Sequence, residues 1–338
     1  MTKTLILGDL HLKNNLSYSE YISDGRVSEK KEILDFIIDQ SEDCQHVVFL
    51  GDFFDAKNNS SQVNKDAVSF IERFGKKDVY IISGNHSKKG DGTTAIDFLA
   101  EVKNKNWHIF TKLNSLEIEG KKIDFLPYML SSELKVENYE EATNKVMKDL
   151  KGGDILFAHH AITGTTFLGI KTDDLREIVL PREKLEAKYK KIFAGHIHVV
   201  QESEQTIVTG NVFTDVVGDI EKFIWKIDDS LNVEKIKVPA REIHKLKDPT
   251  SKELQKIPKN SIVKVVLTDK KIDVEEIEKE LERFEAHLFI FDYPNSRKKM
   301  KIEEGAFDFS LPALLKMYSE AKNVDLQKLL KGLELLDA

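Results

Sequence analysis

Cysteine and long apolar runs are the first things that this sequence lacks. Its 338 residues contain one cysteine, Cys44, so no disulfide can form within the chain. Because unpaired cysteine is typical of reducing compartments, we expect a cytoplasmic protein. No apolar run is long enough to cross a membrane. The first apolar stretch, residues 4–7, leads directly into a polar motif, so no signal peptide is expected either.

Positive charge is also scarce. The chain has 51 lysine and arginine residues against 58 acidic ones, for a net charge of −7. This balance argues against strong nonspecific binding of nucleic acid by the isolated chain, because such binding comes mainly from cationic contacts to phosphates. With 41% hydrophobic residues, a chain of this length can bury a large core and leave room for a second, smaller domain.

Five short polar motifs are present, and each follows an apolar run such as residues 46–50 or 79–82. Runs of this length are typical of buried strands, and the helical patterns between most of them indicate parallel βαβ units. Functional groups in such folds collect beyond the carboxyl ends of the strands, so we expect all five motifs at one edge of a sheet. The motifs are Gly8-Asp9-Leu10-His11, Gly51-Asp52, Gly84-Asn85-His86, His159 and Gly195-His196-Ile197-His198.

The motifs offer imidazole, carboxylate and carboxamide groups, but no thiolate. A mixed nitrogen and oxygen set suits manganese, iron or zinc in a reactive site better than it suits structural zinc. Seven donors are too many for one ion, but they are about right for two ions if one carboxylate bridges them. Two ions about 3.5 to 4 Å apart can hold phosphate oxygens, acidify a water molecule and stabilise an in-line displacement. The candidate ligands are Asp9, His11, Asp52, Asn85, His159, His196 and His198.

Chance occurrence is the alternative for each motif taken alone. Asp-x-His is common, whereas Gly-His-x-His is more specific, because alternate residues of an extended segment point the same way. By the same reasoning His160, next to His159, is expected to pack or to contact substrate rather than to bind metal. The histidines outside the motifs are expected on the surface or in the core: His46, His108, His244 and His287.

Taken together, the motifs resemble the signature blocks of the calcineurin-like metallophosphoesterases, over residues 3–228. The resemblance implies an α/β fold in four layers, with two packed mixed β-sheets flanked by helices. It also divides the candidate ligands between two divalent ions. The implied sets are Asp9, His11 and His198 for one ion, Asn85, His159 and His196 for the other, and Asp52 as the bridge.

The same resemblance implies catalytic roles for Asp52, His86 and Asp55. His86 would stabilise or protonate the departing oxygen, and Asp55 would orient a neighbouring ligand without binding metal. The family normally has an acidic residue after its Gly-Asn-His motif, but this chain has Ser87. A serine can orient the histidine but adds no charge, so His86 is expected to be a weaker acid.

Within this superfamily the chain is most similar to the SbcD-type DNA repair and recombination nucleases, especially the compact phage-encoded ones. Residues 206–211, 218–222 and 223–227 resemble that branch's next strand, its Gly-Glu-x-x-x-Lys-Gly segment and its closing strand. Asn211 replaces a usual hydroxyl residue, and Asp219 replaces a usual glutamate. The resemblance implies a DNA exonuclease, with endonuclease activity left open. It would use manganese, or else magnesium, iron or zinc, in a bacterial cytoplasm or a phage's host.

The resemblance also divides the chain into three regions. Residues 1–238 would form the nuclease domain and residues 239–296 a DNA-capping domain with a strand at 261–267, a helix and a strand at 288–291. Residues 297–338 would form a linker and an ATPase-binding pair of helices. Apolar residues recur at helical spacing in these expected helices: Val274, Ile277, Leu281 and Phe284, then Leu311, Leu314, Leu315 and Tyr318, then Leu326, Leu329, Leu330 and Leu333.

A helical pair this small cannot bury its own apolar faces, so we expect it to dock on another surface. That surface is either the rest of the chain or, as the resemblance implies, the coiled-coil base of an SbcC-like SMC-family ATPase. The branch usually forms a homodimer within a heterotetramer. The helical stripe of Val68, Ile71 and Phe74 could serve dimerisation, although such stripes are more often core.

Two other functions stay open, namely hydrolysis of a small-molecule or protein phosphate ester and a weakly active scaffold of the same fold. The complete set of donors disfavours the scaffold. Three basic clusters could contact DNA or simply face solvent, and Lys88-Lys89 is favoured because it directly follows a metal motif. The clusters are Lys88-Lys89, Lys188-Tyr189-Lys190-Lys191 and Arg297-Lys298-Lys299 with Lys301.

Overall fold

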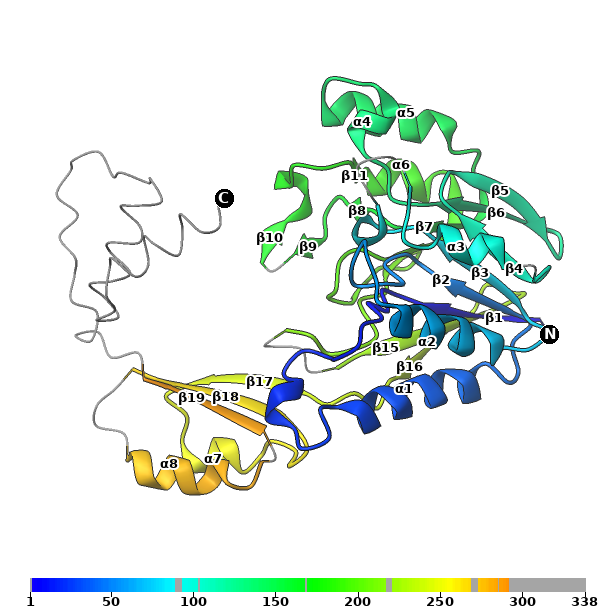
Figure 1. Cartoon of the computed structure of the whole chain (residues 1–338). Helices are drawn as coiled ribbons and strands as arrows, with labels where there is room; N and C mark the ends of the chain where they lie inside the picture. Colours follow the sequence, from blue (N-terminus) through cyan, green and yellow to red (C-terminus); the bar gives the residue numbers. More distant parts are fainter. Residues whose placement is uncertain are drawn as a thin grey trace, which may run out of the picture. The chain divides into compact units, whose positions relative to one another are not determined.

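The computed structural model describes residues 2–88, 93–102, 104–167, 169–216, 221–268, 273–284 and 286–291. The two largest sheets have six strands each (Figure 1). The first has the strand order β16-β15-β1-β2-β3-β4, and the second has the order β13-β14-β12-β7-β6-β5. Four neighbouring strands are parallel in each sheet, and the other two pair antiparallel. Both sheets are therefore mixed.

The strands of the two sheets are short. The first sheet contains β1 (Lys3–Leu7), β2 (His46–Phe49), β3 (Asp78–Ile82), β4 (Trp107–Phe110), β15 (Phe223–Asp228) and β16 (Val233–Lys237). The second contains β5 (Asn114–Ile118), β6 (Lys121–Leu126), β7 (Gly153–Ala158), β12 (Tyr189–Ala194), β13 (Gln201–Glu202) and β14 (Thr206–Val208). Smaller pairs are β8 (Ala161–Ile162) with β11 (Val179–Leu180), and β9 (Thr166–Phe167) with β10 (Ile170–Lys171).

The sheets pack face to face, and helices cover their outer faces. Alternate residues of a strand point to opposite faces, so Ile6 lies in the core between the sheets while Leu5 and Leu7 pack towards helices. In the second sheet, Phe157 likewise lies in the core between the sheets, while Leu156 packs towards helices. The helices on the first sheet are α1 (Val27–Gln40), α2 (Ser61–Glu72) and α3 (Asp97–Glu101), and those on the second are α4 (Ser131–Leu134), α5 (Tyr139–Asp149) and α6 (Arg182–Glu186).

This architecture confirms the expected α/β fold with two mixed sheets flanked by helices. It corrects one expectation drawn from the strand pattern alone, namely that all five motifs share one edge of a single sheet. Three motifs follow strands of the first sheet, and two follow strands of the second. The reason is that a run of buried residues predicts a strand but not the sheet that it joins.

A third, three-stranded parallel sheet follows the two large ones. It contains β17 (Ile243–Lys247), β18 (Ile262–Leu267) and β19 (Ala286–Phe291) in that order, with α7 (Ser251–Leu254) and α8 (Val274–Leu281) beside it. Each helix begins at a side-chain cap, since Thr250 accepts from Glu253 N–H and Asp273 accepts from Glu276 N–H. The expected strand, helix and strand of the capping region are present, and β17 and α7 extend them.

A buried arginine joins this part of the chain to the start of α1. The Arg26 guanidinium is fully buried and forms two hydrogen bonds with the Glu29 carboxylate, at 2.6 and 2.7 Å. Its remaining N–H groups reach the Ser17 carbonyl and both oxygens of Thr214. Glu29 also accepts the main-chain N–H of Arg241 at 3.0 Å, two residues before β17. One ion pair thus holds together segments more than 200 residues apart in sequence.

Several expectations fall on residues outside the described part of the chain. These are the helical pair of residues 297–338, the basic cluster at 297–301, Lys89 and Asp219. Among the described residues, no helix combines the length and the apolarity that crossing a membrane would require. The stripe considered for dimerisation packs inward, because Ile71 and Phe74 are buried in the core on the outer face of the first sheet and Val68 packs against it.

Candidate metal centre

The five motifs converge because each begins where a parallel strand ends. Asp9, Asp52 and Asn85 follow β1, β2 and β3, whereas His159 and His196 follow β7 and β12. The carboxyl ends of parallel strands are where side chains of different βα units meet. Since the two sheets pack face to face, their carboxyl ends bring the two groups of motifs within hydrogen-bonding distance of each other.

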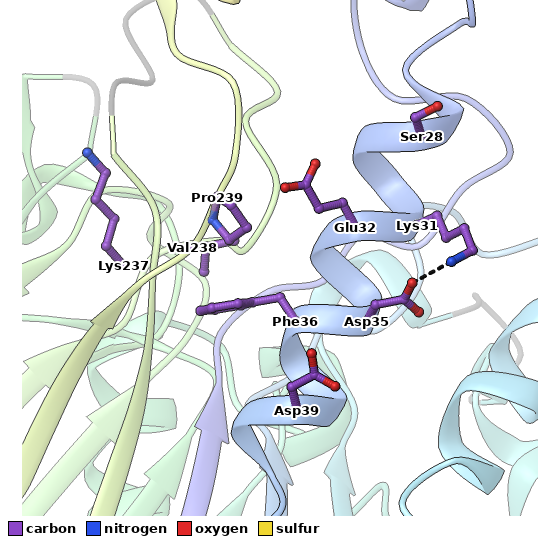
Figure 2. A pocket seen from close by; sticks show the side chains of 9 residues that line it. All are labelled: Ser28, Lys31, Glu32, Asp35, Phe36, Asp39, Lys237, Val238 and Pro239. Carbon is purple, nitrogen blue, oxygen red and sulfur yellow. Dashed lines mark hydrogen bonds and ion pairs between the residues drawn. The ribbon is translucent and has the colours of Figure 1, made fainter.

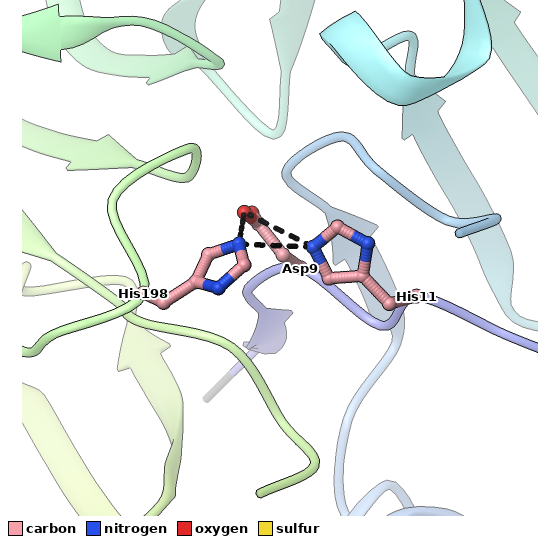
Figure 3. Close-up of side chains that lie close together, drawn as sticks. All are labelled: Asp9, His11 and His198. Atoms are coloured by element: carbon pink, nitrogen blue, oxygen red, sulfur yellow. Dashed lines mark hydrogen bonds and ion pairs between the residues drawn. The ribbon is translucent and has the colours of Figure 1, made fainter. Parts of the chain in front are cut away.

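One set of donors consists of Asp9, His11 and His198 (Figure 3). The Nε2 atoms of the two histidines lie 3.0 Å apart. Asp9 Oδ2 lies 3.9 Å from the His11 Nε2 and 3.5 Å from the His198 Nε2. All three residues therefore direct a nitrogen or oxygen lone pair towards one point, although they come from opposite ends of the domain's sequence.

A second set consists of Asp52, Asn85, His159 and His196. Asn85 Oδ1 lies 3.0 Å from His159 Nε2 and 3.0 Å from His196 Nδ1. Asp52 Oδ2 lies 3.3 Å from the same His159 nitrogen. Asp52 also groups with His11 and His86, and with Asp9 and His159, so its carboxylate stands between the two sets.

These residues fit two divalent cations. Asp9, His11 and His198 would hold one, Asn85, His159 and His196 the other, and Asp52 would contact both, as the resemblance implies. Convergent lone pairs without thiolate are the donors that catalytic transition-metal sites use. When bound, such a pair of ions supplies Lewis-acid stabilisation of a phosphoryl group and a strongly acidified water.

Two glycines are required by the close approach of the carboxylates. A Cβ atom on Gly84 would lie 2.1 Å from Asp52 Oδ1, and one on Gly195 would lie 2.5 Å from Asp9 Oδ1. In return, each carboxylate accepts a main-chain N–H from the facing motif. His86 donates to Asp52 at 2.8 Å, and His196 donates to Asp9 at 3.0 Å. The carboxylates are thereby oriented before any ion binds.

Three of the candidate ligands have left-handed backbone conformations. The φ angles are 46° at His11, 36° at Asp52 and 84° at His196. Side chains other than glycine rarely adopt such angles, and these cost about 1 to 3 kcal/mol each. The surrounding sheets must compensate for this cost, which is typical of residues held in place for chemistry rather than for stability.

In two of the candidate ligands, a hydrogen bond to one imidazole nitrogen determines which nitrogen is left to bind metal. His159 Nδ1 donates to the Leu50 carbonyl oxygen at 2.6 Å, which leaves Nε2 free to bind metal. His196 Nε2 lies 3.0 Å from both oxygens of Glu177, which leaves Nδ1 free. Sequence reasoning missed Glu177, because it lies in an irregular segment without any metal-binding pattern.

His86 is exposed at the rim of the centre and is oriented by backbone. Its Nδ1 lies 2.9 Å from the Asp55 carbonyl oxygen, and its Nε2 has no hydrogen-bond partner among the described residues. The Asp55 carboxylate lies 3.4 Å from His11 Nδ1, as expected of a residue that orients a ligand. The Ser87 hydroxyl is buried and has no hydrogen-bond partner among the described residues. Among the described residues, Ser87 therefore does not orient His86 through a hydrogen bond, and the expectation that His86 is a weaker acid stays a prediction.

A buried lysine stands beside the first donor set. Lys222 donates to Asn211 Oδ1, and the Asn211 amide donates to the Phe213 carbonyl at 2.7 Å. Asn211 pairs with Asp9 in an isolated β-bridge, so this asparagine connects the lysine to the backbone of a candidate ligand. Burial lowers the pKa of His198, and His11 and Lys222 lower it further against the opposing effect of Asp9. His198 is therefore held neutral, the form that binds metal.

Other residues considered at the sequence level lie elsewhere. His160 is fully buried, stacks on Tyr128 with ring centroids 5.1 Å apart, and accepts the Met129 N–H. Lys88 is buried and pairs with Glu133 at 2.7 Å, which weighs against a contact between this lysine and phosphate. The cluster at 188–191 begins β12 and thus lies at the amino end of that strand, away from the donors. His46 is buried, and His108 and His244 are partly buried.

A cavity of about 280 Å³ opens at the centre. It is lined by Asp52, Asn85, His86, Phe167, Leu175, Arg176, Glu177, His196, Ile197 and His198. A larger hollow of about 740 Å³ lies between α1 and the segment after β16 (Figure 2). It contains none of the candidate ligands, and its Asp35 is paired with Lys31 and Arg73. The smaller cavity is therefore the one that coincides with the chemistry.

Metal binding is expected to strengthen with rising pH. Burial opposes protonation of His159, but Asp52 and Asp9 outweigh it and raise the pKa of the metal-free imidazole to about 9. Below that pH the ion must displace a proton, so the apparent affinity for Mn²⁺ should rise about tenfold per pH unit between pH 6 and 8.5. Isothermal titration calorimetry at several pH values in buffers of different ionisation enthalpy measures this. A pH-independent affinity without proton release would contradict it.

The fold and the convergent donors define a class of enzymes that hydrolyse phosphate esters with the help of divalent metal ions. The sequence model of the calcineurin-like phosphoesterases matches residues 2–200, so the chain belongs to that family. It is accordingly a metallophosphoesterase-type hydrolase. No curated protein sequence matches the chain.

Among solved structures, the chain resembles a single mutant of Vps29 from Entamoeba histolytica at 12% identity and a TM-score of 0.31, covering 70% of this chain and 99% of that one. It also resembles a putative 5′-nucleotidase from Staphylococcus aureus in complex with alpha-ketoglutarate at 13% identity and a TM-score of 0.38, covering 83% of this chain and 58% of that one. At these TM-scores, neither resemblance bears on the substrate of this chain.

Proposed function

We propose that the protein is a two-metal-dependent DNA nuclease that hydrolyses phosphodiester bonds as part of an SbcCD-type complex. The observation that carries the chemistry is the pair of donor sets on either side of Asp52. Preference for DNA is supported by the sequence resemblance of residues 206–227 to the nuclease branch. The additional sheet of β17, β18 and β19 supports it as well, since that branch has a capping domain after its nuclease domain.

The exposed rim of the cavity favours a polymeric substrate over a small phosphate ester. Sites for small molecules usually bury most of the ligand. In this cavity His86, at the rim, is exposed. Such a site has room for a phosphodiester group, while the rest of a strand stays outside. The alternative, a site for a complete nucleotide or lipid headgroup, would need more enclosure.

The proposed roles follow from the geometry. Asp52 would contact both ions, and His86 would donate a proton to the departing oxygen through Nε2, for which no hydrogen bond is found among the described residues. Asp55 keeps His11 in its orientation. We propose Mn²⁺ as the preferred ion, because the donors are nitrogen and oxygen atoms without thiolate.

The proposed partner is an SbcC-like SMC-family ATPase, bound through residues 297–338. The sequence supports this through two apolar stripes in that region. The net charge of −7 supports it too, because a chain with an excess of negative charge needs another subunit to hold DNA firmly. The stoichiometry that we propose is a homodimer of this chain within a heterotetramer with the ATPase.

Degradation of end-labelled linear duplex DNA by the full-length chain tests the proposal. We expect Mn²⁺-dependent release of nucleotides that EDTA abolishes and that the ATPase stimulates. Mononucleotides and phosphopeptides, tested in parallel, should be hydrolysed far more slowly. Rapid hydrolysis of a mononucleotide or phosphopeptide, while the DNA is left undegraded, would contradict the proposal. The absence of any turnover with both ions bound would contradict it as well.

A further inference from the structure

The cationic groups near the metal centre are fewer than the sequence suggests. Lys88 is paired with Glu133, and the cluster at 188–191 begins its strand at the far end from the centre. Among the described residues that line the cavity, Arg176 alone has a lysine or arginine side chain. It is exposed, and its guanidinium has no hydrogen-bond or ion-pair partner within the described part of the chain.

The backbone around Arg176 is held firmly, although the side chain is free. The next residue, Glu177, contacts His196 Nε2 at 3.0 Å and the Tyr128 hydroxyl at 3.4 Å. The preceding residue, Leu175, donates its N–H to the Thr172 carbonyl at 3.0 Å. The buried Thr172 hydroxyl in turn reaches the Ile162 carbonyl at 2.7 Å. These contacts therefore fix the backbone of a residue whose unpaired guanidinium lines the same cavity as the candidate ligand His196.

The same side of the cavity has an apolar wall. Phe167 and Leu175 line the cavity, and both pack against the small core formed by Ala161, Ile197 and Val208. Phe167 is only half-buried, so part of its ring remains available for contact. A nucleoside leaving the metal centre on this side of the cavity would meet both an aromatic ring and a guanidinium. Aromatic rings accept bases of any sequence, and guanidinium groups bind phosphate oxygens with two parallel hydrogen bonds.

We propose that Arg176 binds the phosphate next to the scissile one and so makes the enzyme specific for a polynucleotide strand. The inference rests on the proposed nuclease function and adds to it a residue that determines specificity. A substrate with a single phosphate offers Arg176 nothing to bind, whereas a strand does. Arg176 thus acts by binding the strand and not in the chemical step. The groups that would act on the reacting phosphate are already supplied by the two donor sets.

The test compares Arg176→Ala with the full-length wild type on two substrates in Mn²⁺. Octathymidylate has a phosphate next to each scissile one, and bis(p-nitrophenyl) phosphate has a single phosphate. We expect kcat/KM on octathymidylate to fall about 10- to 100-fold, the loss of one charge-assisted contact, and to change less than about threefold on the diester. Arg176→Lys should recover part of the loss, because it keeps the charge but not the two-pronged geometry.

Lys171→Ala is the matched control, since it removes an equal charge from exposed strand β10 of the same segment without lining the cavity. It should leave both rates unchanged, whereas Arg176→Ala should also reduce the slope of log(kcat/KM) against log[salt] by about 1. Equal losses of kcat/KM on both substrates, or no loss on octathymidylate, would overturn the role of Arg176 but not the proposed nuclease function. A wild type that hydrolyses the diester but no DNA would instead overturn the proposed function on which the inference rests.

Discussion

Replacing Asp52 by asparagine is expected to abolish catalysis while leaving the fold in place. Asp52 is the carboxylate between the two donor sets, and its Oδ1 also accepts the His86 N–H at 2.8 Å. An asparagine oxygen can still accept that N–H, so the change removes the charge and keeps the loop. Loss of a bridging carboxylate should lower turnover of bis(p-nitrophenyl) phosphate by about 1000-fold, the upper end of the effect of removing one preorganised electrostatic group.

Metal stoichiometry separates this explanation from misfolding. The wild type should bind two Mn²⁺ ions per chain, and Asp52→Asn should bind at most one tightly, as measured by calorimetry and elemental analysis. Asp78→Asn is the matched control, because Asp78 begins β3, whose carboxyl end carries Asn85, and is partly exposed. It should retain both ions and full turnover. Two tightly bound ions in Asp52→Asn would refute the bridging role.

Removing the Glu29 carboxylate is expected to be the most destabilising of the simple substitutions. The Arg26 guanidinium is fully buried, and Glu29 is its ionic partner at 2.6 Å. Glu29→Ala would leave a buried charge without compensation, which costs about 3 to 5 kcal/mol in the free energy of unfolding. It would also free the Arg241 N–H at the start of the third sheet. Urea denaturation monitored by circular dichroism measures the loss.

An exposed ion pair on the same helix provides the control. Lys31 and Asp35 of α1 also form an ion pair, but the lysine side chain is 76% exposed. Lys31→Ala should therefore change the free energy of unfolding by less than about 1 kcal/mol. The double variant Arg26→Met with Glu29→Leu should be more stable than Glu29→Ala, since it removes both charges together. Equal effects of Glu29→Ala and Lys31→Ala would contradict the buried-pair explanation.

The candidate ligands could be read from the sequence because each stands directly after a strand. Five residues of β1 precede Gly8 and Asp9, and the strand's burial is encoded by consecutive apolar residues. The same holds for His196 after β12. Local sequence therefore determines the chemical identity of the donors and the end of the strand on which they lie. Asp55 was predicted from the resemblance, and its carboxylate does lie near His11.

The residues that surround those donors could not be read in this way. Glu177 and Arg176 lie between η3 (Thr172–Asp174) and β11, where no periodic pattern exists. The Leu50 carbonyl orients His159 across 109 residues, and no side-chain motif encodes a backbone contact. Lys88 illustrates the same limit, because sequence proximity to a motif does not show whether a side chain faces the centre or the core.

The sequence by itself determined the class of chemistry, since it predicts a metal-dependent phosphoesterase site from the types and order of Asp9, His11, Asp52, Asn85, His159, His196 and His198. Only the tertiary structure decided how those donors meet. Two sheets, rather than one, bring their carboxyl ends together, and Asp52 lies between the donor sets as a result. The physical reason is that strand formation depends on neighbouring residues, whereas sheet pairing, burial of charge and access to the cavity depend on contacts between distant segments.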